Sequence, residues 1–259
     1  MTLPLVTRED TSLDPVEWSS TRDVAHNLLD SLLNYTQCVR DRPVWQPIPN
    51  DIRMILENEA FPEQGQTLSD VCQHVLTYFL PYSLGNTHPR FWAWVVGEGT
   101  LGGTLADLIA ATTNSMTGGG THSAILVERT VIKWMRQLFG YPEGSTGGLI
   151  ASGTSMATVT CLAAARQKAL ANVRTDGLIN GPKLVAYAST EVHICVVRAF
   201  ELLGLGSNVL RRVSVDENFC INIDELKACI RTDRDNGFLP FCIIGNAGMS
   251  DRGLQEKFT

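Results

Sequence analysis

The second half of the chain alternates between short apolar runs and helical patterns, and this alternation limits the possible folds more than any other feature. Runs at 183–189 and 208–215, and a third beginning at 238, have the length and composition of buried strands. Helical periodicity covers 191–203 and 222–233, and Asn222 and Glu225 stand in the capping-box positions of the second of these helices. Strands separated by helices form parallel sheets with right-handed crossovers. We therefore expect an α/β fold in which the last strand is central and ligands bind at the carboxyl ends of the strands.

The first part of the chain has only helical patterns. Apolar residues recur at helical spacing over 16–40, 50–59 and 67–80, and a proline-rich stretch separates the first two. We expect an N-terminal helical segment over 1–85 and a larger α/β domain over 86–259. Further helices are expected at 101–113, 122–139 and 155–172.

Charge and cysteine content exclude several classes of protein. The net charge is −6 and no basic run is present, so a nucleic-acid or membrane-surface partner is not expected. The acidic N-terminus does not resemble a signal peptide, and no apolar stretch is long enough to cross a membrane. The seven cysteines are scattered and form no CxxC pair, which predicts no metal site, no disulfide framework and a cytoplasmic location.

The stretch "GLIASGTSMAT" begins at Gly148 and joins an apolar run to a helix. Gly148 and Gly153 have the spacing of a nucleotide-binding P-loop, but Thr154 stands where that motif needs lysine. Backbone N–H groups at the helix start, with the hydroxyls of Thr154 and Ser155, could instead hold one phosphate. An ordinary helix N-cap explains the same residues. The local sequence leaves both interpretations open.

A second glycine motif, "GEGTLG" at Gly97–Gly102, matches the G-x-G-x-x-G fingerprint of dinucleotide-binding proteins. That fold also needs a second strand with an acidic residue about 20 positions later. The corresponding region here, "ATTNSMTGGGTHS", is not a strand. A structural glycine turn is favoured, and an NAD(P)-binding oxidoreductase remains an alternative.

His193 and a cluster of aromatic residues near residue 90 are further candidate functional residues. His193 falls in the first turn of a helix after the strand at 183–188, at the carboxyl edge of the sheet. A lone histidine is more often structural, but this one lies beside a possible phosphate site. Phe91, Trp92 and Trp94 cluster next to His88, and form either a hydrophobic anchor or the wall of a substrate pocket. A serine hydrolase is excluded because "GTSMA" is not G-x-S-x-G.

Four separated segments together resemble the group II pyridoxal 5′-phosphate (PLP)-dependent amino-acid decarboxylases. They begin at "HPRFWAWV", "GGLIASGTSMAT", "LVAYASTEVHICVV" and "FLPFCIIGNAG", and the resemblance covers about residues 50–248 in order. This group includes aromatic-L-amino-acid, tyrosine, histidine and glutamate decarboxylases. The resemblance implies the large domain of the PLP-dependent transferase fold type I, PLP as cofactor, decarboxylation of an L-amino acid, and a homodimer.

The resemblance also implies roles for individual residues. Thr154 and Ser155 would hold the PLP phosphate, His193 would stack on the pyridine ring as a catalytic residue, and Asn246 would line the cofactor. The segment at the substrate entrance would supply His88, Phe91, Trp92 and Trp94. Thr121 and His122, near the expected dimer interface, are weaker candidates.

The chain departs from the family pattern after "GNAG", residues 245–248, where it reads "MSDRGLQEKFT". The family carries an aspartate for the pyridine nitrogen and a His-Lys pair for the Schiff base beyond this point, and none of the five lysines here follows a histidine. We therefore expect a C-terminally truncated chain with little turnover. The alternative is a non-catalytic partner of a full-length decarboxylase. The tryptophans permit an aromatic substrate without establishing one.

Overall fold

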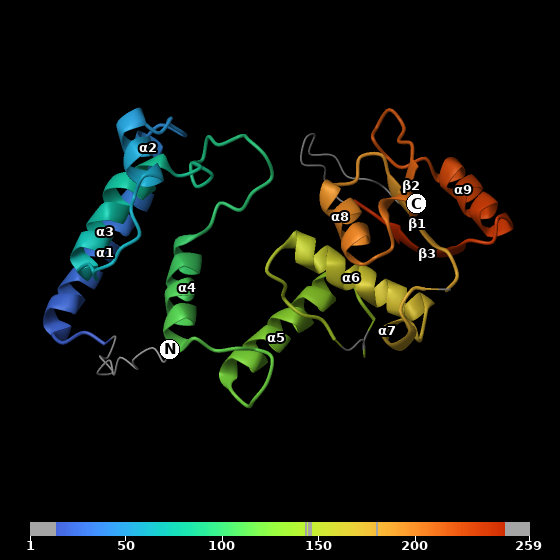
Figure 1. Cartoon of the computed structure of the whole chain (residues 1–259), viewed down its shortest axis with the longest axis horizontal. Helices are drawn as coiled ribbons and strands as arrows, with labels where there is room; N and C mark the ends of the chain where they lie inside the picture. Colours follow the sequence, from blue (N-terminus) through green and yellow to red (C-terminus); the bar gives the residue numbers. More distant parts are fainter. Residues whose placement is uncertain (1–13, 143, 145–146, 180, 247–259) are drawn as a thin grey trace, which may run out of the picture. The chain divides into compact units, whose positions relative to one another are not determined.

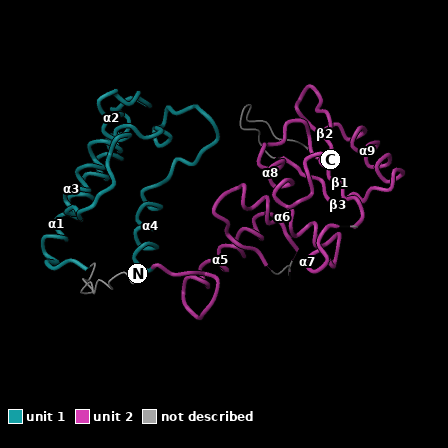
Figure 2. The backbone as a smooth tube through the Cα atoms, viewed as in Figure 1, with its two compact units in different colours: residues 1–113 teal, residues 114–259 magenta. Residues whose placement is uncertain are grey.

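The computed structural model describes residues 14–142, 144, 147–179 and 181–246. The chain divides into two compact units, residues 1–113 and 114–259 (Figure 2). The boundary expected at 85/86 falls inside the first unit. Each unit is described by itself.

The described part of the first unit is helical, as the sequence predicts. Its α-helices are α1 (Trp18–Gln37), α2 (Asn50–Glu57), α3 (Leu68–His74) and α4 (Leu101–Thr113). Helix α3 continues through a π-helical turn (Val75–Phe79) and a 3-10 turn (Leu80–Tyr82), so helical geometry extends two residues beyond the end expected at residue 80. A further 3-10 turn, Val39–Asp41, follows α1.

The second unit contains the α/β alternation (Figure 1). Its helices are α5 (Ser123–Leu138), α6 (Thr154–Ala169), α7 (Val173–Asp176), α8 (Ile194–Leu202) and α9 (Ile223–Asp235). Its strands are β1 (Leu184–Ser189), β2 (Leu210–Val213) and β3 (Leu239–Ile244), all parallel, in the order β2-β1-β3. The expectation that the third strand is central is wrong for the described residues, because β1 takes that place. All six residues of β1 are buried, whereas β3 is partly exposed.

Helices cover both faces of this sheet. On one face Leu162 of α6 and Phe200 of α8 pack against Ala186 and Ala188 of β1. On the other face Leu226 belongs to a cluster with Val185 and Tyr187, so α9 covers that side. Burial of β1 on both faces explains why its sequence, "LVAYAS", has no polar alternation.

The start of α9 is predicted only in part. Asn222 is the N-cap, and its side chain accepts the N–H of Glu225 at 3.0 Å. The reciprocal bond of a capping box is absent, because the Glu225 carboxylate accepts the backbone N–H and the hydroxyl of Ser214. The backbone N–H of Asn222 donates instead to the carbonyl of Ser214 at 2.9 Å. Glu225 therefore joins α9 to the end of β2.

A charged cluster is buried between β1, β2 and α9. Asp233 accepts the hydroxyl of Tyr187 at 2.9 Å and the Nη2 of Arg211 at 2.8 Å. The guanidinium of Arg211 lies 5.0 Å from the ring centre of Phe238. Hydrogen bonding to Arg211 lowers the pKa of Asp233, and burial raises the pKa of Tyr187.

No described helix is both long enough and apolar enough to cross a membrane. The same residues contain no group of three or more His, Cys, Asp or Glu side chains placed to hold a metal ion.

Candidate cofactor site

The N-terminus of α6 leaves backbone donors uncapped. Gly153 is the N-cap and provides no side-chain hydrogen bond, and the first N–H to reach an acceptor in the helix is that of Ala157, bonded to the Gly153 carbonyl at 3.0 Å. The N–H groups of Thr154, Ser155 and Met156 therefore have no acceptor within the helix. The side chains of Thr154 and Ser155 are exposed. Donors at a helix N-terminus, beside two hydroxyls, have the chemistry that binds a phosphate.

His193 lies at the start of the next long helix. It is the N-cap of α8 and not a first-turn residue as expected, and its Nδ1 accepts the N–H of Cys195 at 3.1 Å. Because Nδ1 accepts this hydrogen bond, the neutral ring carries its proton on Nε2. The side chain is exposed, so the cap fixes the ring while leaving part of it accessible.

The starts of α6 and α8 lie close together. The hydroxyl of Thr158 donates to the carbonyl of Thr154 at 2.8 Å, and it lies 3.9 Å from the Sγ of Cys195. Cys195 is the residue whose N–H is capped by His193. Thr158 and Cys195 thus connect Thr154 to His193. The structure therefore brings together Thr154 and His193, which the sequence predicts to be site residues.

The carboxyl ends of β1 and β3 complete this region. The chain leaves β1 at Ser189 and reaches His193 four residues later, whereas Asn246 follows the end of β3 by two residues. Ala188 and Ile244 are partners in the parallel register, so both strands end at the same edge of the sheet. Asn246 is half-buried there. We call Gly153, Thr154, Ser155, His193 and Asn246 the sheet-edge site.

The aromatic residues expected at the substrate entrance lie in the first unit, whereas the sheet-edge site lies in the second. Phe91 and Trp94 have ring centres 6.4 Å apart. Trp92 is 90% exposed and Trp94 69% exposed, while the neighbouring His88 is buried.

The dinucleotide interpretation of Gly97–Gly102 is wrong. Helix α4 begins at Leu101, but the described residues 86–100 contain no strand before it. A dinucleotide fingerprint needs a strand that leads directly into its glycine turn. Gly97 and Gly99 belong to an irregular segment that enters α4, and Gly102 lies in the first turn of that helix.

A polar connection on α5 was not found from the sequence. Glu128 accepts the N–H of Ile150 at 3.1 Å, and its hydrogen bonds to the Thr117 hydroxyl and to this N–H lower its pKa. It thereby joins the glycine-rich loop before α5 to the segment that leads into α6. His122 is the N-cap residue of α5, and its Nε2 lies 3.2 Å from the carbonyl of Gly119; Thr121 is exposed. The only sequence signal for Glu128 is that it is the single carboxylate in the helical stretch "ILVERTVIKWM".

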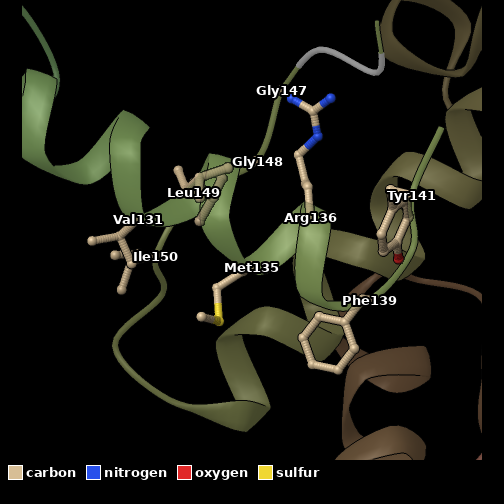
Figure 3. Close-up of a pocket in the computed structure, with 10 residues that line it drawn as sticks. Val131, Met135, Arg136, Phe139, Tyr141, Gly147, Gly148, Leu149 and Ile150 are labelled. Carbon is tan, nitrogen blue, oxygen red and sulfur yellow. The ribbon is translucent and has the colours of Figure 1, made fainter. Parts of the chain in front are cut away.

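An apolar cavity of about 400 Å³ lies between α5 and residues 147–150 (Figure 3). At Gly148, φ is +141° and an added Cβ would lie 2.7 Å from the Cγ2 of Ile132. This glycine therefore allows close packing against α5, which explains its presence without a phosphate loop. Most of the other lining residues are apolar: Val131, Met135, Phe139, Leu149 and Ile150, together with Tyr141 and Arg136.

Comparison with known proteins decides the family. Residues 49–258 match the profile of the pyridoxal-dependent decarboxylase conserved domain. The chain belongs to this family. Over 246 residues it is 31% identical to an aromatic-L-amino-acid decarboxylase of Bacillus atrophaeus, covering 91% of this chain and 48% of that protein. A tyrosine decarboxylase 2 of Narcissus pseudonarcissus is 26% identical, with 96% of this chain and 51% of that protein covered.

Solved structures share the fold. The 4-hydroxyphenylacetaldehyde synthase of Rhodiola rosea superposes with a TM-score of 0.81 at 23% identity, covering 94% of this chain and 53% of that one. An Oryza sativa TDC solved with PLP and tryptamine gives 0.80 at 21% identity, with coverages of 92% and 51%. The expected fold type I is therefore confirmed. This pyridoxal-dependent decarboxylase chain spans about half the length of the curated relatives it matches.

Proposed function

We propose that the chain carries the phosphate-binding part of a PLP site that serves decarboxylation of an L-amino acid. The observation that carries this proposal is the uncapped, exposed N-terminus of α6 next to the histidine-capped start of α8. Both lie where ligands bind in parallel α/β sheets, at the carboxyl edge.

Each residue of the sheet-edge site has a separate task in this proposal. The backbone donors of α6, with the hydroxyls of Thr154 and Ser155, bind the phosphate and fix the position of the cofactor. His193 presents its ring at a fixed orientation, because its Nδ1 is held by the N–H of Cys195. Asn246 provides a polar side chain at the same edge. PLP, when bound, withdraws electrons from the substrate Cα as CO₂ leaves.

Three of the four described lysines, Lys168, Lys183 and Lys227, lie away from this site. Lys168 is in the last turn of α6, 14 residues beyond Thr154, or about 21 Å along the helix axis. Lys183 precedes β1 at the opposite edge of the sheet, and Lys227 is on α9, which covers the other face. We therefore propose that this 259-residue chain holds PLP through its phosphate and ring without a covalent bond to these lysines, and that its own turnover is low.

Substitutions of His193 separate its two tasks. Asparagine can still accept the N–H of Cys195 but has no ring, whereas phenylalanine keeps a ring but cannot cap. We expect His193→Asn to keep the free energy of unfolding within about 0.5 kcal/mol and to weaken PLP binding about tenfold. His193→Phe should lose about 1 kcal/mol of stability and keep most of the affinity.

The measurements are urea unfolding and titration with PLP. His26, an exposed histidine on α1, provides the control variant His26→Asn, which should match the original chain in both. Full PLP affinity in His193→Asn would contradict a stacking role for this ring.

The substrate is proposed only as an L-amino acid. The exposed Trp92 and Trp94, with the partly buried Phe91, favour an aromatic side chain, and two relatives are named for aromatic-L-amino-acid and tyrosine decarboxylation. A cytoplasmic location remains part of the proposal.

Association with a second copy, or with a full-length decarboxylase, is also proposed. It is supported by exposed apolar side chains along α5, since patches of this kind mark interaction surfaces. These side chains are Leu126, Val127, Trp134, Met135 and Leu138, which are between 44% and 73% exposed.

A further inference from the structure

His88 is the only buried side chain in the described residues of the first unit, 14–113, and it is 3% exposed. Its Nδ1 accepts the N–H of Arg90 at 3.0 Å. Its backbone N–H donates to the carbonyl of Gly85, and its own carbonyl accepts the N–H of Phe91, both at 2.9 Å. One residue thus holds two consecutive turns, 85–88 and 88–91.

These turns form the base of the loop that carries the exposed aromatic residues. The side-chain amide of Asn86 donates to the carbonyl of Gly97 at 2.6 Å and closes the loop 86–97. Trp92 and Trp94 project from it with exposures of 90% and 69%. The position of both rings therefore depends on the turns that His88 holds. We call residues 86–97 the aromatic loop.

The hydrogen bond from Arg90 also fixes the tautomer of His88. Nδ1 is an acceptor, so the neutral ring carries its proton on Nε2. Nε2 is buried and has no hydrogen-bond partner among the described residues, and the same holds for the Nε of Arg42. Both side chains line one cavity of about 10 Å³, which is room for a single water molecule. Because both atoms are donors, a water oxygen can accept from each of them.

Arg42 is itself held in place. Its guanidinium carbon lies 3.3 Å from the ring centre of Tyr35, and its Nη2 donates to the Tyr35 carbonyl at 3.0 Å. The Tyr35 hydroxyl in turn donates to the carbonyl of Leu80 at 3.0 Å. Arg42 is therefore fixed relative to both α1 and the segment that leads into the aromatic loop.

We propose that His88 is a positioning residue: its Nδ1 holds the turns at the base of the aromatic loop, and one water shared between its Nε2 and Arg42 fills the cavity beside α1. It does not contact substrate, in contrast to the role expected from the sequence. The effect on substrate binding rests on the proposed function, whereas the anchoring of the loop does not.

Two substitutions of His88 distinguish the roles of its two ring nitrogens. The Oδ1 of asparagine can replace Nδ1 as acceptor for the Arg90 N–H, whereas the amide of glutamine replaces Nε2. We expect hydrogen exchange of the Arg90 amide to stay within about threefold in His88→Asn and to accelerate about tenfold in His88→Gln. Long-range nitrogen NMR of the original chain should show the proton on Nε2. His26→Asn and His26→Gln, on the exposed face of α1, are the matched controls and should change nothing.

A proton on Nδ1, or slow exchange in His88→Gln with fast exchange in His88→Asn, would overturn the proposal. Titration of the PLP-loaded chain with L-phenylalanine gives a separate result. Weaker binding in His88→Gln but not in His88→Asn supports positioning of the aromatic loop. Weaker binding in both variants, with Arg90 exchange unchanged in His88→Asn, makes the ring a direct substrate contact and overturns the proposal. If the original chain binds no amino acid while the exchange results hold, the proposed function fails and the anchoring stands.

Discussion

Replacing Gly153 with aspartate is expected to stabilise the chain slightly and to weaken its binding of PLP about 100-fold. The new carboxylate would cap the N-terminus of α6, for which Gly153 has no side chain. An added Cβ meets nothing within 4 Å, so the site has room for it. The same carboxylate would occupy the donors needed by the phosphate and would repel it. The helix end contributes up to about 2 kcal/mol to anion binding, and repulsion between the carboxylate and the phosphate costs about 1 kcal/mol. Together these account for the 100-fold loss of affinity.

Gly153→Ser is the matched control, because serine caps the helix without adding charge. We expect it to gain a similar stability and to lose much less affinity. The readouts are urea unfolding and PLP titration for the three proteins. If Gly153→Asp binds PLP within threefold of the original chain, the phosphate does not lie at the start of α6.

Replacing Asp233 with alanine is expected to destabilise the second unit by about 3 kcal/mol. The change leaves the buried Tyr187 hydroxyl and the Arg211 guanidinium without their shared acceptor. Loss of one partner of a buried ion pair costs about 3–5 kcal/mol, and the lower end applies because the Arg211 side chain is 32% exposed. Removing Arg211 as well should recover part of the loss, since no unpaired guanidinium then remains.

The same cluster predicts how stability varies with pH. The pKa of Asp233 is lowered in the folded chain, so its stabilisation is present above the unfolded pKa of about 3.9 and is lost as pH falls through the lower folded pKa. The pKa of Tyr187 is raised, so its contribution is present below about pH 10 and is lost as pH rises above that value. The free energy of unfolding, measured across pH, should fall less at acid pH in Asp233→Asn than in the original chain. It should fall less at alkaline pH in Tyr187→Phe. Unchanged profiles would contradict the structural role of this cluster.

The sequence predicts most elements of the fold because their signals are local. The continuous apolar run of β1 indicates a strand buried on both faces, and Asn222 identifies the start of α9. The order of the strands is not local. Placing β1 and not β3 at the centre depends on which strands pair in space, and an apolar run alone does not contain that information.

The candidate site shows the same limit. Thr154 and Ser155 were expected at a helix start. The helix that follows β1 was expected to begin at residue 191 but begins at Ile194, so His193 is its N-cap and not a first-turn residue. Glu225 was expected to complete a capping box, but Ser214, eleven residues earlier, takes its carboxylate. The burial of His88 could not be predicted either, since its cavity is formed by residues more than 40 positions away, such as Arg42 and Tyr35.

The account depends most on the phosphate being held at the start of α6. The most direct measurement is an amide NMR titration of the chain with PLP, and separately with pyridoxal, which lacks the phosphate. We predict that PLP shifts the amide signals of Thr154, Ser155 and Met156 saturably and that pyridoxal at the same concentrations does not. Equal shifts with both compounds, or no shift of these three amides with PLP, would contradict the proposed site.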